Sequence, residues 1–212
     1  MSKYGKITAG LIAAWFVAIF WASAEHLFVN PGARLGVSIA IAAMAPMIAF
    51  SLWVARSEGF RNFALSLNPR VLTSLQVGRI AGFVFIVLEA RNVLPAIFAM
   101  PAGYGDMFIG ATAGFAAWKL AEPARRGSFI FWQVLGILDL VTAVSVGTTA
   151  GLLDPHGPSM LPMTMLPLSL IPTFFVPLFL MLHVICIAQA RTWKDVEPAR
   201  RSVAGAVQHP AI

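Results

Sequence analysis

The segment "IPTFFVPLFLMLHVICIAQ", residues 171–189, decides the class of this protein. It belongs to an apolar run over 166–190 that is interrupted by few polar side chains. About 20 consecutive apolar residues are enough to cross a bilayer as a helix. Five further runs of this kind lie at 7–24, 35–55, 79–99, 101–120 and 129–150. The sequence therefore predicts an all-α bundle of six transmembrane helices, in one domain over 1–192 with a polar cytoplasmic tail over 193–212.

Composition and charge placement support a membrane protein. Of the 212 residues 58% are hydrophobic and only 11% are charged, whereas soluble domains keep roughly 25% charged residues. The net charge of +6 is explained by the excess of Lys and Arg in cytoplasmic loops, so no nucleic-acid partner is expected. With both termini in the cytoplasm, Arg34 lies outside and Arg91 within a span. The residues expected on the cytoplasmic side are Lys3, Lys6, Arg56, Arg61, Arg70, Arg79, Lys119, Arg125, Arg126, Arg191, Lys194, Arg200 and Arg201.

Two segments are expected to depart from straight spans. Residues 57–78 carry Phe60, Phe63 and Leu67 at helical spacing, which predicts an interfacial amphipathic segment on the cytoplasmic side. Pro172 and Pro177 fall inside the last apolar run and predict a kinked last helix.

The stretch "AMPAGYGDMF", residues 99–108, ends like a potassium-channel selectivity filter. Pro101 and Ala102 replace the Thr-Val of a filter. A filter would also leave only the residues from Asp106 to Lys119 for the fourth span, about 21 Å of helix, short of the roughly 30 Å core. We interpret the stretch as a Pro/Gly hairpin entering a helix, with Asp106 capping the first amides.

Ionisable residues inside spans are costly and are candidates for function. Glu89 lies ten residues after Arg79, and Asp139 ten after Phe129, so both acids are expected about 15 Å into the membrane. Arg91 faces away from Glu89 and could reach Asp106. Two acids that share a buried site cannot both be charged at low cost. The candidate ligand or ion site consists of Glu89, Arg91, Asn92, Asp106, Asp139 and His183.

This cluster favours a membrane protein that binds or transports a small molecule or ion, with proton coupling through the mid-membrane acids. One alternative is a membrane enzyme acting on a lipophilic substrate, with Glu89 or Asp139 as its acid or base. Another is an accessory subunit of a larger membrane complex. A third is a purely structural polar network that fixes helix packing.

Metal and cofactor sites are expected to be absent. A haem between His26 and His183 would need two ligands that face each other, and these histidines lie toward opposite sides of the membrane. His156, Met160, Met163 and Met165 could bind Cu(I), with Met44 and Met47 extending its path, but methionine is also an ordinary packing residue. Gly110 and Gly114 form a GxxxG pattern, which leaves a homodimer open.

Three stretches carry a resemblance: "LPAIFAMPAGYGDMFIG", "GILDLVTAVSVGT" and "IPTFFVPLFLMLHVICIAQ". Over roughly residues 76–190 the chain resembles an uncharacterised family of small predicted bacterial multi-pass inner-membrane proteins. The resemblance implies a bacterial inner-membrane location. That family has no assigned function, so the resemblance transfers no functional residue.

Overall fold

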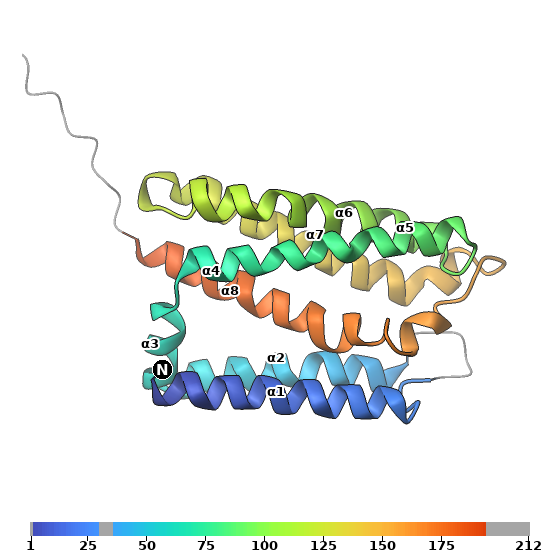
Figure 1. Cartoon of the computed structure of the whole chain (residues 1–212), viewed down its shortest axis with the longest axis horizontal. Coiled ribbons are helices and arrows are strands. Elements are labelled where there is room, and N and C mark those ends of the chain that lie inside the picture. The colour runs from blue at the N-terminus through green and yellow to red at the C-terminus, as the bar shows by residue number, and fades with distance from the viewer. Residues whose placement is uncertain (1, 30–35, 194–212) are drawn as a thin grey trace, which may run out of the picture.

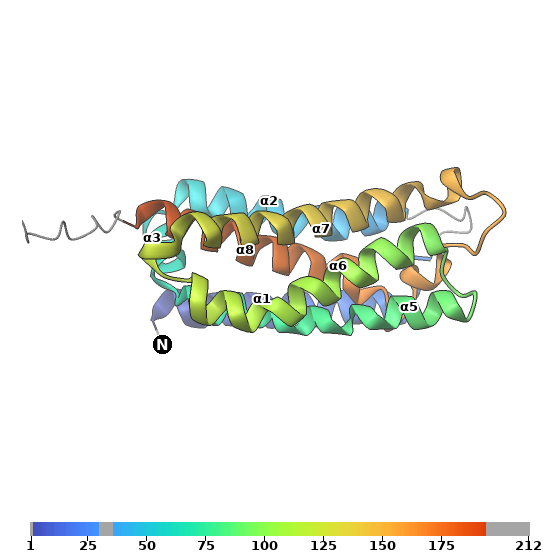
Figure 2. The same cartoon turned by 90° about the horizontal axis from the view of Figure 1, so that it is seen from above.

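The protein is an all-α assembly, as expected, in a computed structural model that describes residues 2–29 and 36–193. Its helices lie mostly along the long axis of the molecule (Figure 1, Figure 2). They are α1 (Lys3–Ala24), α2 (Val37–Arg56), α3 (Glu58–Ser66), α4 (Pro69–Ser74), α5 (Phe83–Ala90), α6 (Ala96–Phe115), α7 (Arg126–Leu153) and α8 (Val176–Thr192). Short 3₁₀ segments occupy Leu75–Gly82, Pro123–Arg125 and Leu161–Thr164, and π-helical turns occupy Ala116–Leu120 and Ile171–Phe175. The expected tail over 193–212 lies outside the described residues from 194 onward.

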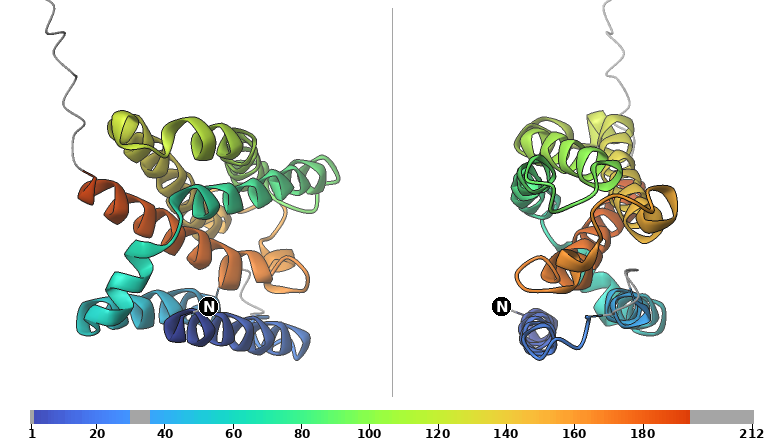
Figure 3. Two further views of the ribbon diagram at one scale, coloured as in Figure 1. Left: turned by 60° about the vertical axis from the view of Figure 1, so that its left-hand side comes forward. Right: turned by 90° about the vertical axis from the view of Figure 1, so that its right-hand side faces the viewer.

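Five helical stretches are long and apolar enough to cross a membrane: Lys3–Ala24, Val37–Arg56, Pro69–Ala90, Pro123–Leu153 and Ile171–Thr192. The remaining expected span, the fourth in chain order at 101–120, corresponds to α6 and its continuation to Leu120. This stretch has a similar length, but Pro101, Asp106 and its glycines lower its hydropathy. The α1–α2 pair is peripheral, since 11% and 6% of their apolar stretches are buried, against 44% for the stretch that contains α8. α8 lies between that pair and the group formed by α4 to α7 (Figure 3).

The third long helix begins earlier than the expected run at 79–99. It starts at Pro69, and the Asn68 side chain accepts a hydrogen bond from the Arg70 amide at 2.9 Å. Proline is favoured at the first helical position because its missing N–H would have no partner there. The helix passes through the 3₁₀ segment Leu75–Gly82 and ends at Ala90. Consequently Arg79, expected at the cytoplasmic surface, lies in the middle of this helix.

The expected interfacial segment over 57–78 is therefore divided between two helices. Its first part is α3, which crosses the end of the bundle (Figure 1). Phe60 of α3 is buried and stacks on Trp53 with ring centroids 3.7 Å apart. The Gln189 amide of α8 donates to carbonyl groups at the end of α3, including that of Leu67 at 2.7 Å. The second part of the segment belongs to the third long helix.

Residues 99–108 are helical, so the expected hairpin at this stretch is wrong. The turn lies earlier, between Ala90 and Ala96, where Asn92 has a positive φ of 56°. Asp106 therefore does not cap a helix but lies near the middle of α6. Glycines here allow close helix packing: a Cβ on Gly103 would lie 2.6 Å from the Ile86 side chain, and one on Gly110 would lie 2.5 Å from the Ile80 nitrogen.

Candidate ligand site around Arg79

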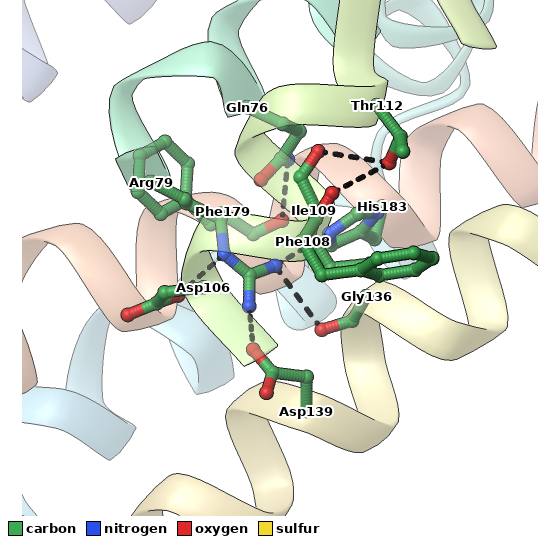
Figure 4. Close-up of polar contacts among 10 residues, drawn as sticks. All are labelled: Gln76, Arg79, Asp106, Phe108, Ile109, Thr112, Gly136, Asp139, Phe179 and His183. Carbon is green, nitrogen blue, oxygen red and sulfur yellow. Dashed lines mark hydrogen bonds and ion pairs between the residues drawn. The ribbon is translucent and has the colours of Figure 1, made fainter. Parts of the chain in front are cut away.

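Arg79 lies at the centre of the bundle with a side chain only 1% exposed. Its Nε donates to Asp106 of α6 at 2.7 Å, and its Nη2 donates to the carboxylate of Asp139 of α7. Its Nη1 donates to the Gly136 carbonyl at 3.2 Å and contacts His183 Nε2 of α8 at 3.3 Å (Figure 4). Four of the five guanidinium N–H groups thus have partners. One cation links three helices to the 3₁₀ segment that carries it.

The direction of the hydrogen bonds at His183 follows from the chemistry of its partners. Arginine has no acceptor, so Nε2 of His183 must accept from Arg79 and carry no proton. Nδ1 then donates to the Gln133 side-chain oxygen. The Gln133 amide donates to Thr73 Oγ1 at 3.0 Å, and Thr73 lies 3.8 Å from Cys186 Sγ. His183 is therefore neutral and belongs to a polar chain that crosses the bundle.

Three glycines make room for these side chains. A Cβ on Gly105 would lie 1.6 Å from Asp139 Oδ1, and one on Gly82 would lie 2.4 Å from the Cβ of Asp106. On α7, a Cβ at Gly136 would lie 2.3 Å from the His183 ring. These distances are far below van der Waals contact. Within the "GYGD" stretch, Gly105 thus makes room for the ion-pair cluster, whereas Gly103 makes room for Ile86 of α5.

The cluster holds two carboxylates against one guanidinium, because His183 is neutral. If both acids are ionised, its net charge is −1. An uncompensated charge is costly away from water. Binding one further positive charge would therefore lower the free energy of the cluster. The two acids are also the more accessible members, with side chains 14% and 15% exposed for Asp106 and Asp139.

Asp106 also faces a cavity of about 260 Å³. Among the described residues lining this cavity, Asp106 is the one charged side chain. Most of the others are apolar, and Thr148 already donates its hydroxyl to helix carbonyls. The cavity extends from the middle of α6 toward the Gly36 end of α2 and toward Met160 and Met163. Asp106 thus binds Arg79 through its carboxylate and also belongs to the wall of an apolar space.

The structure brings together three of the six residues expected at the site: Asp106, Asp139 and His183. Asp106 and Asp139 pair with Arg79, whereas Arg91 was expected to reach Asp106. Arg91 and Asn92 are exposed in the turn after α5, and Glu89 is in the last turn of that helix. No described residue forms a hydrogen bond or ion pair with the side chain of Glu89, Arg91 or Asn92. The expected shared depth of Glu89 and Asp139 is therefore wrong.

Sequence reasoning missed Arg79 and gave Gln133 and Gly136 no role at the site. A signal for Arg79 did exist: Asn68-Pro69 is a helix-start signature, and a start there moves Arg79 into the bundle. In the described parts of the chain, no three His, Cys, Asp or Glu side chains are grouped as a metal site requires.

A family model described as a domain of unknown function (DUF8737) matches residues 33–191. The match covers the described helices from α2 onward and nearly all of α8, and it includes every residue of the Arg79 cluster. α1 lies outside it. No curated protein and no solved structure matches the chain.

Proposed function

The chain belongs to the DUF8737 family, and we propose that it is a membrane-embedded protein that binds and transports a small molecule or ion. Asp106 and Asp139 take up the proton or cation, and Arg79 holds both carboxylates in place. The assignment of the acid pair differs from the sequence-based expectation, which used Glu89 in place of Asp106.

One observation carries this proposal: Asp106 belongs both to the buried ion-pair cluster and to the wall of the cavity. A cluster built only for helix packing would be most stable when neutral and sealed. This one has one carboxylate more than it has cations, and it places that excess charge beside space that a ligand can enter. Intramembrane acids in such surroundings are typical of proton and ion sites.

The proposal includes six transmembrane crossings, in which α6 is added to the five apolar stretches named above. It also includes a bacterial inner-membrane location. The starts of α1 and α4 and the ends of α2 and α8 lie at one end of the bundle (Figure 1). Basic side chains concentrate there, which supports that end as cytoplasmic. Those within the described residues are Lys3, Lys6, Arg56, Arg61, Arg70, Lys119, Arg125, Arg126 and Arg191.

Infrared difference spectroscopy of the purified full-length protein in detergent tests the proton site. We expect the carbonyl stretch of a protonated carboxylic acid to change as the pH is varied, and this signal to disappear in Asp139→Asn and Asp106→Asn. Glu89→Gln is the matched control, because it removes a carboxylate outside the cluster. A signal that is the same in the wild type and both Asn variants would show that the cluster binds no proton and would overturn the proposed function.

A further inference from the structure

We propose that the cavity beside Asp106 accepts a hydrophobic organic cation, of the size of a benzyl-substituted ammonium ion, in exchange for one proton. This inference rests on the proposed function and names its substrate class. It follows from three properties of the cavity: its size, its lining and the charge at its inner end.

The size of the cavity sets the size of the ligand. An engineered cavity of about 150 Å³ accepts benzene, and this cavity of about 260 Å³ has room for an aromatic ring and a small substituted head. This volume cannot enclose a lipid with full acyl chains. A bare inorganic cation would leave most of the apolar wall without contacts, which gives poor packing.

The lining favours an apolar, polarisable ligand. Phe85 and Phe98 lie in the wall with ring centroids 5.3 Å apart, and aromatic rings attract organic cations. Met44, Met160 and Met163 also line the cavity, and thioethers adapt to irregular apolar and aromatic shapes. A strongly hydrated ligand would lose its water here and find few hydrogen-bond partners in return.

The charge at the inner end selects a cation. The negative charge of Asp106 would repel an anion in the cavity. A cation, in contrast, neutralises the excess negative charge of the cluster. The charged and titratable side chains that face Asp106 directly or through Arg79 are Arg79, Asp139 and His183. When the acid pair holds one proton, the cluster is neutral. Binding of a cation releases that proton to solvent, and the charge of the site is unchanged.

Isothermal titration calorimetry of the full-length protein with benzyltrimethylammonium tests this inference, with neopentylbenzene as the uncharged probe of the same shape. Titrations in two buffers of different ionisation heat measure the number of protons released. We expect one proton released per bound cation, affinity that rises about tenfold per pH unit while the acid is protonated, and much weaker binding of the neutral probe.

Two pairs of variants separate the cavity from general effects on folding. Asp106→Asn removes the charge, and Glu89→Gln is its control. Ala143→Phe fills the cavity without touching the charges, and Ala111→Phe adds the same ring to an exposed position of α6. Binding is expected to fall at least tenfold in Asp106→Asn and Ala143→Phe and to stay unchanged in both controls.

The failure of this inference is distinguishable from failure of the proposed function. Equal binding of the charged and neutral probes would overturn the inference, because binding would then be apolar only. A larger cavity of about 590 Å³ between α1, α2, α3 and α8 has no charged side chain in its described lining and would give that result. No binding of the cation, together with an intact infrared signal from the acids, would also overturn the inference and leave the proton site standing.

Discussion

Replacing Gly105 by alanine tests the position of the Asp139 carboxylate most directly. The new methyl group would lie 1.6 Å from Asp139 Oδ1 and 2.6 Å from its Cγ. The carboxylate must withdraw by roughly 2 Å to reach ordinary contact, which breaks its bond to Arg79. Loss of one partner from a buried charge cluster costs about 3–5 kcal/mol, and the better helix propensity of alanine offsets about 1 kcal/mol of this. The expected net loss is about 2–4 kcal/mol.

Gly114→Ala is the matched control on the same helix. Its added methyl group meets nothing within 4 Å, so only the propensity term acts. Thermal unfolding in detergent can be followed with a thiol-reactive fluorophore, because Cys186 is the protein's single cysteine and is buried. At about 2–4 °C per kcal/mol for a chain of this length, Gly105→Ala is expected to lower the Tm by roughly 4–16 °C, and Gly114→Ala to raise it slightly.

A double-mutant comparison isolates the carboxylate. In an Asp139→Ala background the clash at Gly105 is gone, so Gly105→Ala is expected to cost little. If Gly105→Ala raises the Tm of the wild type as Gly114→Ala does, the Asp139 carboxylate does not lie against α6, and the reasoning is refuted.

Three further outcomes follow from the same cluster. Arg79→Met leaves two half-buried acids without a cationic partner and is expected to destabilise the protein by about 3–5 kcal/mol. Arg70→Met on the same long helix removes an exposed cation beside Trp118 and is expected to cost less than about 1 kcal/mol; equal Tm values would contradict the burial of Arg79. Gln133→Leu strands the Nδ1–H of His183 and is expected to cost about 1–3 kcal/mol in unfolding free energy, and an unchanged Tm would show that the polar chain is not formed. Cys186, 1% exposed, is expected to resist maleimide until the protein is denatured, and rapid labelling of the native protein would refute its burial.

Local sequence features predicted the existence of the long helices better than their ends. The apolar runs at 7–24, 35–55 and 129–150 correspond closely to α1, α2 and α7, because about 20 apolar residues in a row have few alternatives to a membrane helix. The third helix was misplaced because Gln76 and Arg79 interrupt its first half, so the apolar run alone starts too late. Both side chains are buried against neighbouring helices. The sequence of one helix does not show which helices will pack against it, so this burial could not be predicted from the local pattern.

The "GYGD" stretch shows a related limit. Proline and glycine are common in turns, and from the sequence alone a hairpin was the simpler interpretation. In the folded protein Gly103 and Gly105 lie inside α6 on two different faces. Ile86 of α5 approaches Gly103, and the Asp139 carboxylate of α7 approaches Gly105, each too closely for a side chain. Glycines of this kind are required by close contacts with other helices. A local sequence pattern holds no information about such contacts.

The sequence by itself determined the class of the protein: its apolar runs and scarce charges predict an all-α membrane protein, and its intramembrane acids mark Asp106 and Asp139 as candidates. Only the tertiary structure decided which cationic side chain pairs with these two acids. Arg79 meets Asp106 and Asp139 at one site because three helices and the 3₁₀ segment that carries Arg79 come together there. Pairing between distant side chains depends on helix rotation and depth together. The third long helix starts at Pro69, ten residues before the expected 79, and this shift places Arg79 at the centre of the bundle where Glu89 and Arg91 were expected.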